Sequence, residues 1–159
     1  MMSPGEEARR KVEEFAQQAE YRREFIVIQT VFLAFLPIIY AGFIFTYGDD
    51  LWTVNGTTIA VYSTAMDLPN APESWGTFFL IVGVGVLVAL FTRHDMWLAI
   101  IAALTALVVC AFMVSFATDY VRYDAPQALP AALVYGVVGL SFFNLSRLAW
   151  VSARHKVRL

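Results

Sequence analysis

Charged residues are scarce in this chain of 159 residues. They make up 15% of it, whereas about a quarter of a typical soluble domain is charged. Apolar residues reach 59%, and a globule of this size in water has too little interior to bury so much apolar surface. The composition therefore argues against a soluble enzyme, a disordered linker or a free nucleic-acid-binding protein. It indicates an integral membrane protein.

Cysteine and histidine are nearly absent. Cys110 is the one thiol, which excludes an internal disulfide and a cysteine-rich metal site, and its apolar surroundings predict a small buried side chain. His94 and His155 stand beside Arg or Lys outside the apolar runs, so no facing pair is available for membrane haem. We find no nucleophile elbow, zinc-protease motif, phosphate loop or facing carboxylate pair. The sequence predicts no catalytic, cofactor-binding or metal site.

Long apolar runs are abundant. Residues 25–47, 76–92, 96–118 and 129–146 contain no Asp, Glu, Lys, Arg or His. The 23 residues of the first run make about 35 Å of helix, which is enough to cross a hydrocarbon core of about 30 Å. The predicted fold is an all-α integral membrane protein in which residues 1–159 form one four-helix transmembrane bundle. Uncharged spans also argue against a transporter or a charge-selective channel.

Positive charges are distributed unequally between the segments that connect these runs. Ten of the eleven Lys and Arg residues fall in the two terminal tails and the short loop at Arg93. Only Arg122 falls in the other two loops, residues 48–75 and 119–128. The positive-inside rule therefore predicts that both termini are cytoplasmic. The opposite side becomes a weakly acidic outer face that includes Asp119.

The tail at residues 1–24 predicts a cytoplasmic helix. Pro4, Glu6 and Glu7 suit a first helical turn, and charges of both signs then alternate up to Glu24. Only a thin apolar stripe interrupts these charges. We therefore expect a solvated helix that runs into the first span.

The first outer loop, residues 48–75, is long for a simple connection. Asn55-Gly56 suits a type I′ turn because both central positions need a positive φ, and the residues on both sides are rich in β-branched and aromatic types. The sequence therefore predicts a β-hairpin between the flanks 51–54 and 57–62. The loop residues of greatest interest are Trp52, Asn55, Gly56 and Trp75.

Tryptophan and tyrosine gather at the ends of the apolar runs, where amphipathic rings commonly sit at the membrane–water interface. We therefore expect an interfacial aromatic belt rather than a cofactor pocket. Its predicted members are Tyr47, Trp52, Trp75, Trp97, Tyr120, Tyr123 and Trp150.

Small residues recur at a spacing of four in the third and fourth runs. Such pairs let helix backbones approach closely, which drives helix association in lipid. The pattern is compatible with packing inside one bundle and with contact between copies of the chain. The residues concerned are Ala99, Ala102, Ala103, Ala106, Ala132 and Gly136. In the first run, Pro37 predicts a kink.

Residues 61–76 read Val-Tyr-Ser-Thr-Ala-Met-Asp-Leu-Pro-Asn-Ala-Pro-Glu-Ser-Trp-Gly, and the charged N-terminal helix ends in Ala19-Glu-Tyr-Arg-Arg23. With the four-span plan, these segments resemble small membrane proteins of actinobacteriophages that are often encoded beside endolysin genes and described as holin-like. The resemblance implies a protein that oligomerises in the bacterial cytoplasmic (inner) membrane and permeabilises or depolarises it, so that endolysin can act. The expected partners are the lipid bilayer, further copies of the chain and a second holin-like protein. Nucleic acid is not an expected partner.

A holin needs no catalytic residue, cofactor or selectivity filter, which fits this sequence. A large water-filled lesion, however, needs a wettable helix face, and the third and fourth spans contain few polar side chains. These are Thr105, Ser115, Ser141, Asn144 and Ser146. The alternative function is therefore a non-catalytic accessory or structural subunit, or a modulator, of a larger membrane complex. The plan also resembles that of claudins in outline, but their outer-loop cysteine pair is missing here.

Overall fold

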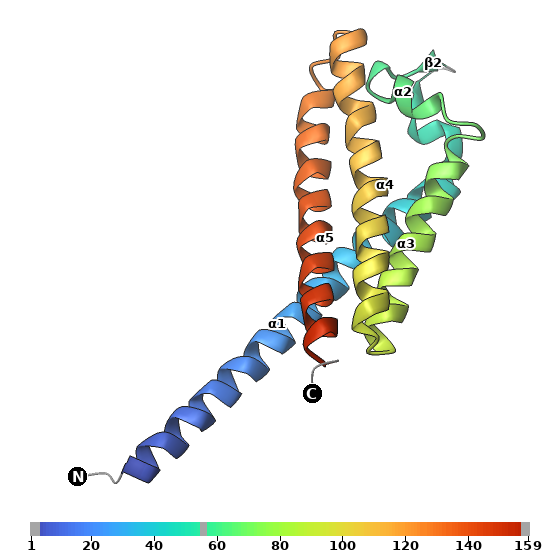
Figure 1. Ribbon diagram of the computed structural model, residues 1–159. Helices are drawn as coiled ribbons and strands as arrows, with labels where there is room; N and C mark the ends of the chain where they lie inside the picture. The colour runs from blue at the N-terminus through green and yellow to red at the C-terminus, as the bar shows by residue number, and fades with distance from the viewer. Residues whose placement is uncertain (1–3, 55–56, 157–159) are drawn as a thin grey trace.

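The computed structural model describes residues 4–54 and 57–156 and is 85% helical. Its α-helices are α1 (Pro4–Tyr47), α2 (Ser63–Met66), α3 (Glu73–Phe91), α4 (Asp95–Arg122) and α5 (Ala128–Lys156). Between α1 and α2 lie two 3-10 helices and two short strands (Figure 1). They are η1 (Gly48–Leu51), β1 (Thr53–Val54), β2 (Thr57–Thr58) and η2 (Ala60–Tyr62).

Four of these helices are long and apolar enough to cross a membrane. The corresponding segments are Ile26–Tyr47, Glu73–Phe91, Asp95–Arg122 and Ala128–Arg154. The predicted all-α class and its four helices of membrane-spanning length are therefore confirmed. The fourth span, α5, does not end at Ser146, where the uncharged run ends. It continues through Arg147 to Lys156.

Helix α1 carries the N-terminal segment and the first span as one helix of 44 residues. Figure 1 shows it crossing the bundle obliquely, with its N-terminal part extending away from the other helices. Pro37 lies inside α1 without ending it, and it is buried against Gly83 of α3. A Cβ atom added to Gly83 would lie 3.1 Å from Pro37 Cγ and 2.6 Å from Ile38 Cγ1, so only glycine permits this close approach.

The spans form two closely packed antiparallel pairs, α1 with α3 and α4 with α5. A smaller contact between α3 and α4 joins the pairs, whereas α1 and α5 scarcely touch. The α4–α5 contact depends on small residues. A Cβ atom on Gly139 would lie 2.9 Å from Cys110 Sγ, and the Ser146 hydroxyl donates a hydrogen bond of 2.8 Å to the Ala99 carbonyl.

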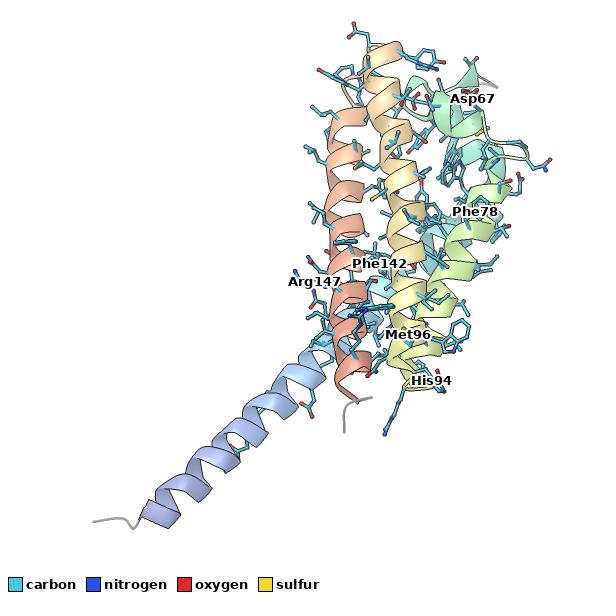
Figure 2. The ribbon with its side chains drawn as sticks, viewed as in Figure 1. Asp67, Phe78, His94, Met96, Phe142 and Arg147 are labelled. Atoms are coloured by element: carbon cyan, nitrogen blue, oxygen red, sulfur yellow. The ribbon has the colours of Figure 1, made fainter. Side chains whose placement is uncertain are left out.

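Residues 48–54 and 57–72 form a cap at the end of the bundle opposite both termini, above the ends of α1 and α3 and beside α4 (Figure 1). Figure 2 shows Asp67 on this cap and His94 and Met96 at the other end. The strands β1 and β2 are antiparallel and pair over two residues each, Thr53 with Thr58 and Val54 with Thr57. This pairing is shorter than the predicted flanks, because the chain turns into η1 before it and into η2 after it. The Asn55-Gly56 turn lies outside the described residues, and the predicted hairpin turn stays a prediction.

Candidate functional site

Eight aromatic side chains meet beneath the cap in what we call the aromatic cluster. Phe112 of α4 occupies its centre, with its ring centroid 4.8–6.0 Å from those of six other rings. Most of these pairs meet at steep angles, the edge-to-face arrangement that the ring quadrupole favours. The cluster joins all four spans to the cap. Its members are Tyr40, Trp52, Tyr62, Trp75, Phe79, Phe112, Phe116 and Tyr135.

Trp52 and Trp75 belong to this interior, so their predicted place in the interfacial belt is wrong. Trp52 has no exposed surface and stacks on Tyr62 of the cap at a centroid distance of 5.4 Å. Trp75 is 7% exposed, and its Nε1 donates a hydrogen bond of 2.8 Å to the Ala65 carbonyl. Both indoles are buried because the cap folds over them. The other predicted members, Tyr47, Trp97, Tyr120, Tyr123 and Trp150, remain 40–60% exposed.

Asp119 is the polar centre of the contact between the cap and the bundle. It is fully buried in α4, and its Oδ1 accepts hydrogen bonds from the Thr64 backbone N–H at 2.8 Å and the Thr64 hydroxyl at 2.6 Å. Thr64 lies in the first turn of α2, where Tyr62 at the N-cap supplies no side-chain bond. Backbone N–H groups in a first turn have no partner within their own helix. A carboxylate 55 residues further along the chain therefore caps α2.

The sequence pattern groups Asp119 with the acidic residues of the outer face, whereas in the structure its side chain is fully buried. Its carboxylate follows the uncharged run 96–118 directly, and α4 continues through it to Arg122 instead of ending at Thr118. The sequence feature that could have indicated its burial is its position, one residue past a long apolar run that can continue as a helix. Its partner Thr64 gave no signal, because nothing local connects the two residues.

Two buried polar atoms of this region have no hydrogen-bond partner among the described residues. They are Oδ2 of Asp119 and Nε1 of Trp52. An unpaired buried polar group opposes folding, because water would otherwise solvate it. Burial of the neighbouring Tyr62 also raises the pKa of its hydroxyl, since the charged phenolate is poorly solvated there. The cap is thus seated on a polar and aromatic surface whose polar groups are only partly satisfied.

Neighbouring residues of α2 are bonded to different spans. Thr64 donates to Asp119 of α4, and the carbonyl of Ala65 accepts from Trp75 of α3. The short helix α2 therefore bridges the capped ends of α3 and α4.

Of the loop residues singled out from the sequence, Trp52 and Trp75 come together in the aromatic cluster. Asn55 and Gly56 lie outside the described residues.

The small residues predicted to promote helix association lie within the chain's own bundle. Ala99, Ala102, Ala106 and Ala132 are buried, whereas Ala103 and Gly136 are half-buried. A Cβ atom on Gly136 would lie 3.1 Å from Met113 Sδ of α4. Their observed contacts correspond to packing inside one bundle, one of the two interpretations that the pattern left open.

Most of the span hydroxyl groups with a hydrogen bond are bonded to backbone carbonyls of the helices that carry them, whereas Ser146 and Ser152 of α5 bond to α4. Six of the span hydroxyls donate to the carbonyl four residues earlier, at 2.7–3.2 Å, a local bond that satisfies the hydroxyl without a partner helix. These residues are Thr30, Thr46, Thr105, Ser115, Thr118 and Ser141. Three of them, Thr30, Thr105 and Ser115, are also buried inside the bundle.

Among the side chains that the structure describes, no group of three or more His, Cys, Asp or Glu residues could hold a metal ion. What the arrangement does offer is a folded cap, a buried carboxylate that bonds it to α4, and long apolar helix faces. Comparisons with protein-family models, with curated proteins and with solved structures find no match to this chain.

Proposed function

We propose that this chain is a non-catalytic, holin-like phage lysis protein. It associates with further copies in the bacterial cytoplasmic membrane and permeabilises or depolarises it, so that an endolysin can act. In this proposal both termini and the solvated N-terminal part of α1 are cytoplasmic, and the cap faces outward. The ten-to-one distribution of Lys and Arg supports this orientation, and the resemblance of residues 61–76 supports the lysis system.

The observation that carries the proposal is the uncovered face of the first span. Only 22% of the most apolar segment of α1 is buried, against 44% in α4. Large apolar side chains that are 46–71% exposed follow one another along α1 at helical spacing. They are Ile28, Phe32, Phe35, Leu36, Ile39 and Phe43. Since α1 packs against α3 and scarcely touches α5, this face is available to a second copy.

Gly42 supports a contact at this face. It continues the row of Ile28 and Phe35 at a spacing of seven, which keeps it on the same side of the helix. A Cβ atom on Gly42 would meet nothing within 4 Å, whereas Gly83 and Gly139 face close neighbours from other helices. The fold of a single chain therefore does not require glycine at this position. Close approach of another backbone in the membrane does benefit from it.

The proposal is tested by inducing the chain in a bacterial host and recording membrane potential, with and without a cytoplasmic endolysin. We expect an abrupt loss of potential, followed by lysis that depends on the endolysin. Gly42→Leu should delay or abolish both events at equal membrane levels, because it blocks close approach without a clash inside the chain. Ala111→Leu, which enlarges an exposed small residue of α4, is the matched control and should behave like the unaltered chain. An intact potential at verified membrane expression would contradict the proposal.

The second candidate is a non-catalytic accessory or structural subunit, or a modulator of another membrane protein. The bonding of span hydroxyls to backbone carbonyls favours it, because hydroxyls that are buried or already bonded within their own helix are poorly suited to line a water-filled lesion. In the same experiment this candidate predicts an unchanged potential. It also predicts that a defined partner copurifies with the chain in stoichiometric amounts after mild detergent extraction.

A further inference from the structure

We propose that α2 is a releasable clip that holds the helical hairpin α3–α4 closed at its capped end. The clip consists of Thr64 and Ala65 together with their partners, Asp119 on α4 and Trp75 on α3. Its release separates the capped ends of α3 and α4. The clip is a property of the fold, and it can be tested whether or not the chain permeabilises membranes.

The first argument is the placement of the clip along the α3–α4 contact. At one end of this contact the two helices are joined by the short turn that contains Arg93, whose φ is +56°. At the other end no direct chain connection joins them, and α2 bridges them instead (Figure 1). A hairpin that is fixed at its turn can open only at its other end, where the clip is located.

The second argument is the division of the bundle into two pairs. Helix α3 packs most extensively against α1, and α4 packs most extensively against α5. The contact between α3 and α4 is smaller, and that between α1 and α5 is slight. The boundary between the two pairs is therefore the surface along which the bundle separates most easily, and the clip crosses this boundary.

The third argument is the incomplete bonding of Asp119. Its Oδ1 accepts two hydrogen bonds, whereas its fully buried Oδ2 has no partner among the described residues. Opening the cap lets water solvate both oxygens, so solvation opposes the closed state. A carboxylate with both oxygens satisfied would lock the cap more firmly. This geometry supports a contact between Asp119 and α2 that keeps the cap closed and that can be released.

Opening would expose the face of the aromatic cluster that α3 and α4 share. Across this boundary the ring of Phe112 lies 4.8 Å from Trp75 and 5.3 Å from Phe79. These rings are buried in the closed state. The clip therefore controls access to an apolar surface at the capped end of the bundle.

The clip is tested by the rate at which a maleimide labels a cysteine placed on the buried face of the cap, with the protein in lipid nanodiscs. In a Cys110→Ala background, Ala65→Cys is the reporter, because Ala65 is 1% exposed and its bonded carbonyl is retained. Asp67→Cys, on the exposed surface of the cap, is the reference for full access (Figure 2). We expect slow labelling of the Ala65→Cys reporter and fast labelling of the Asp67→Cys reference.

Thr64→Val keeps the shape of the side chain and removes its hydrogen bond to the carboxylate. It should accelerate labelling of the reporter about tenfold, the effect of losing one buried hydrogen bond. Thr118→Val is the matched control, since the hydroxyl of Thr118 bonds only its own helix, and it should leave the rate unchanged. Trp75→Phe removes the other bond of the clip while keeping an aromatic ring, and it should also accelerate labelling.

A second reporter distinguishes opening of the cap from general unfolding. Ala153→Cys lies on α5 at the end of the bundle remote from the cap, where it is 8% exposed. It should label equally slowly with and without Thr64→Val. Equal labelling of the Ala65→Cys reporter in the Thr64→Val and Thr118→Val chains would overturn the inference. Accelerated labelling of both reporters would also overturn it, because the substitution would then unfold the whole bundle.

Discussion

Replacing Phe112 by alanine should destabilise the bundle more than any equal deletion on its surface. The ring of Phe112 has no exposed surface and contacts six other rings, which come from α1, the cap, α3, α4 and α5. No nearby side chain can refill the space without breaking several ring contacts. Phe112→Ala therefore leaves a cavity where the four spans and the cap meet.

The expected loss follows from the size of that cavity. In a bilayer the separated helices are still surrounded by apolar lipid, so the transfer of the ring out of water contributes little. The cavity contribution remains. The substitution removes roughly 100 Å³ of side chain, and about 24 cal/mol per Å³ of cavity gives a loss of about 2 kcal/mol. This corresponds to about a thirtyfold change in the unfolding equilibrium constant.

Unfolding can be followed by tryptophan fluorescence during titration of mixed micelles with sodium dodecyl sulfate. Trp52 and Trp75 contact Phe112 directly, at centroid distances of 6.0 and 4.8 Å, and their emission reports on the cluster. Trp97 and Trp150 are exposed and can be changed to phenylalanine to remove their signal. Phe143→Ala is the matched control: Phe143 is 61% exposed on α5, so its loss leaves no cavity. Equal losses of unfolding free energy in Phe112→Ala and Phe143→Ala would refute the reasoning.

Two further predictions concern the helix contact α4–α5 and the cap. Gly139→Leu should lower the free energy of unfolding by about 1–3 kcal/mol, because its Cβ would already lie 2.9 Å from Cys110 Sγ, and the same titration measures this loss. Burial raises the pKa of Tyr62 above its usual value of 10.0, so the neutral hydroxyl contributes stability that is lost as pH rises through the raised pKa. Unfolding measured above pH 10 should therefore depend less steeply on pH in Tyr62→Phe, and identical slopes would contradict this.

The four spans could be predicted because a bilayer imposes a simple rule on sequence. A helix that crosses it must be long and largely uncharged, and residues 25–47 and 96–118 satisfy that rule without reference to any other segment. Predicted small residues likewise lie in close helix contacts, as the short distance between Gly136 of α5 and Met113 of α4 illustrates. The spans follow from the apolar solvent that the bilayer provides. The small-residue pairs follow from residues four positions apart in the chain.

The cap contact could not be predicted from such local patterns. Asp119 and Thr64 are 55 residues apart, and a carboxylate after an apolar run is equally compatible with an exposed loop. Trp52 and Trp75 lie at span ends, where amphipathic rings usually anchor a helix at the interface. Their burial depends on the folding of the cap over them, which only the assembled structure shows. Sequence periodicity describes one helix or strand at a time, whereas the aromatic cluster is built from α1, the cap, α3, α4 and α5.

Vesicle permeabilisation by the purified chain tests the proposed function most directly. The protein would be inserted into liposomes that contain fluorescent dyes of graded size, at increasing ratios of protein to lipid, and insertion would be verified by flotation. We predict dye release that begins steeply above a threshold ratio and is shifted to higher ratios by Gly42→Leu. Liposomes that retain their dyes at every ratio, with insertion verified, would contradict permeabilisation by this chain and favour the accessory subunit.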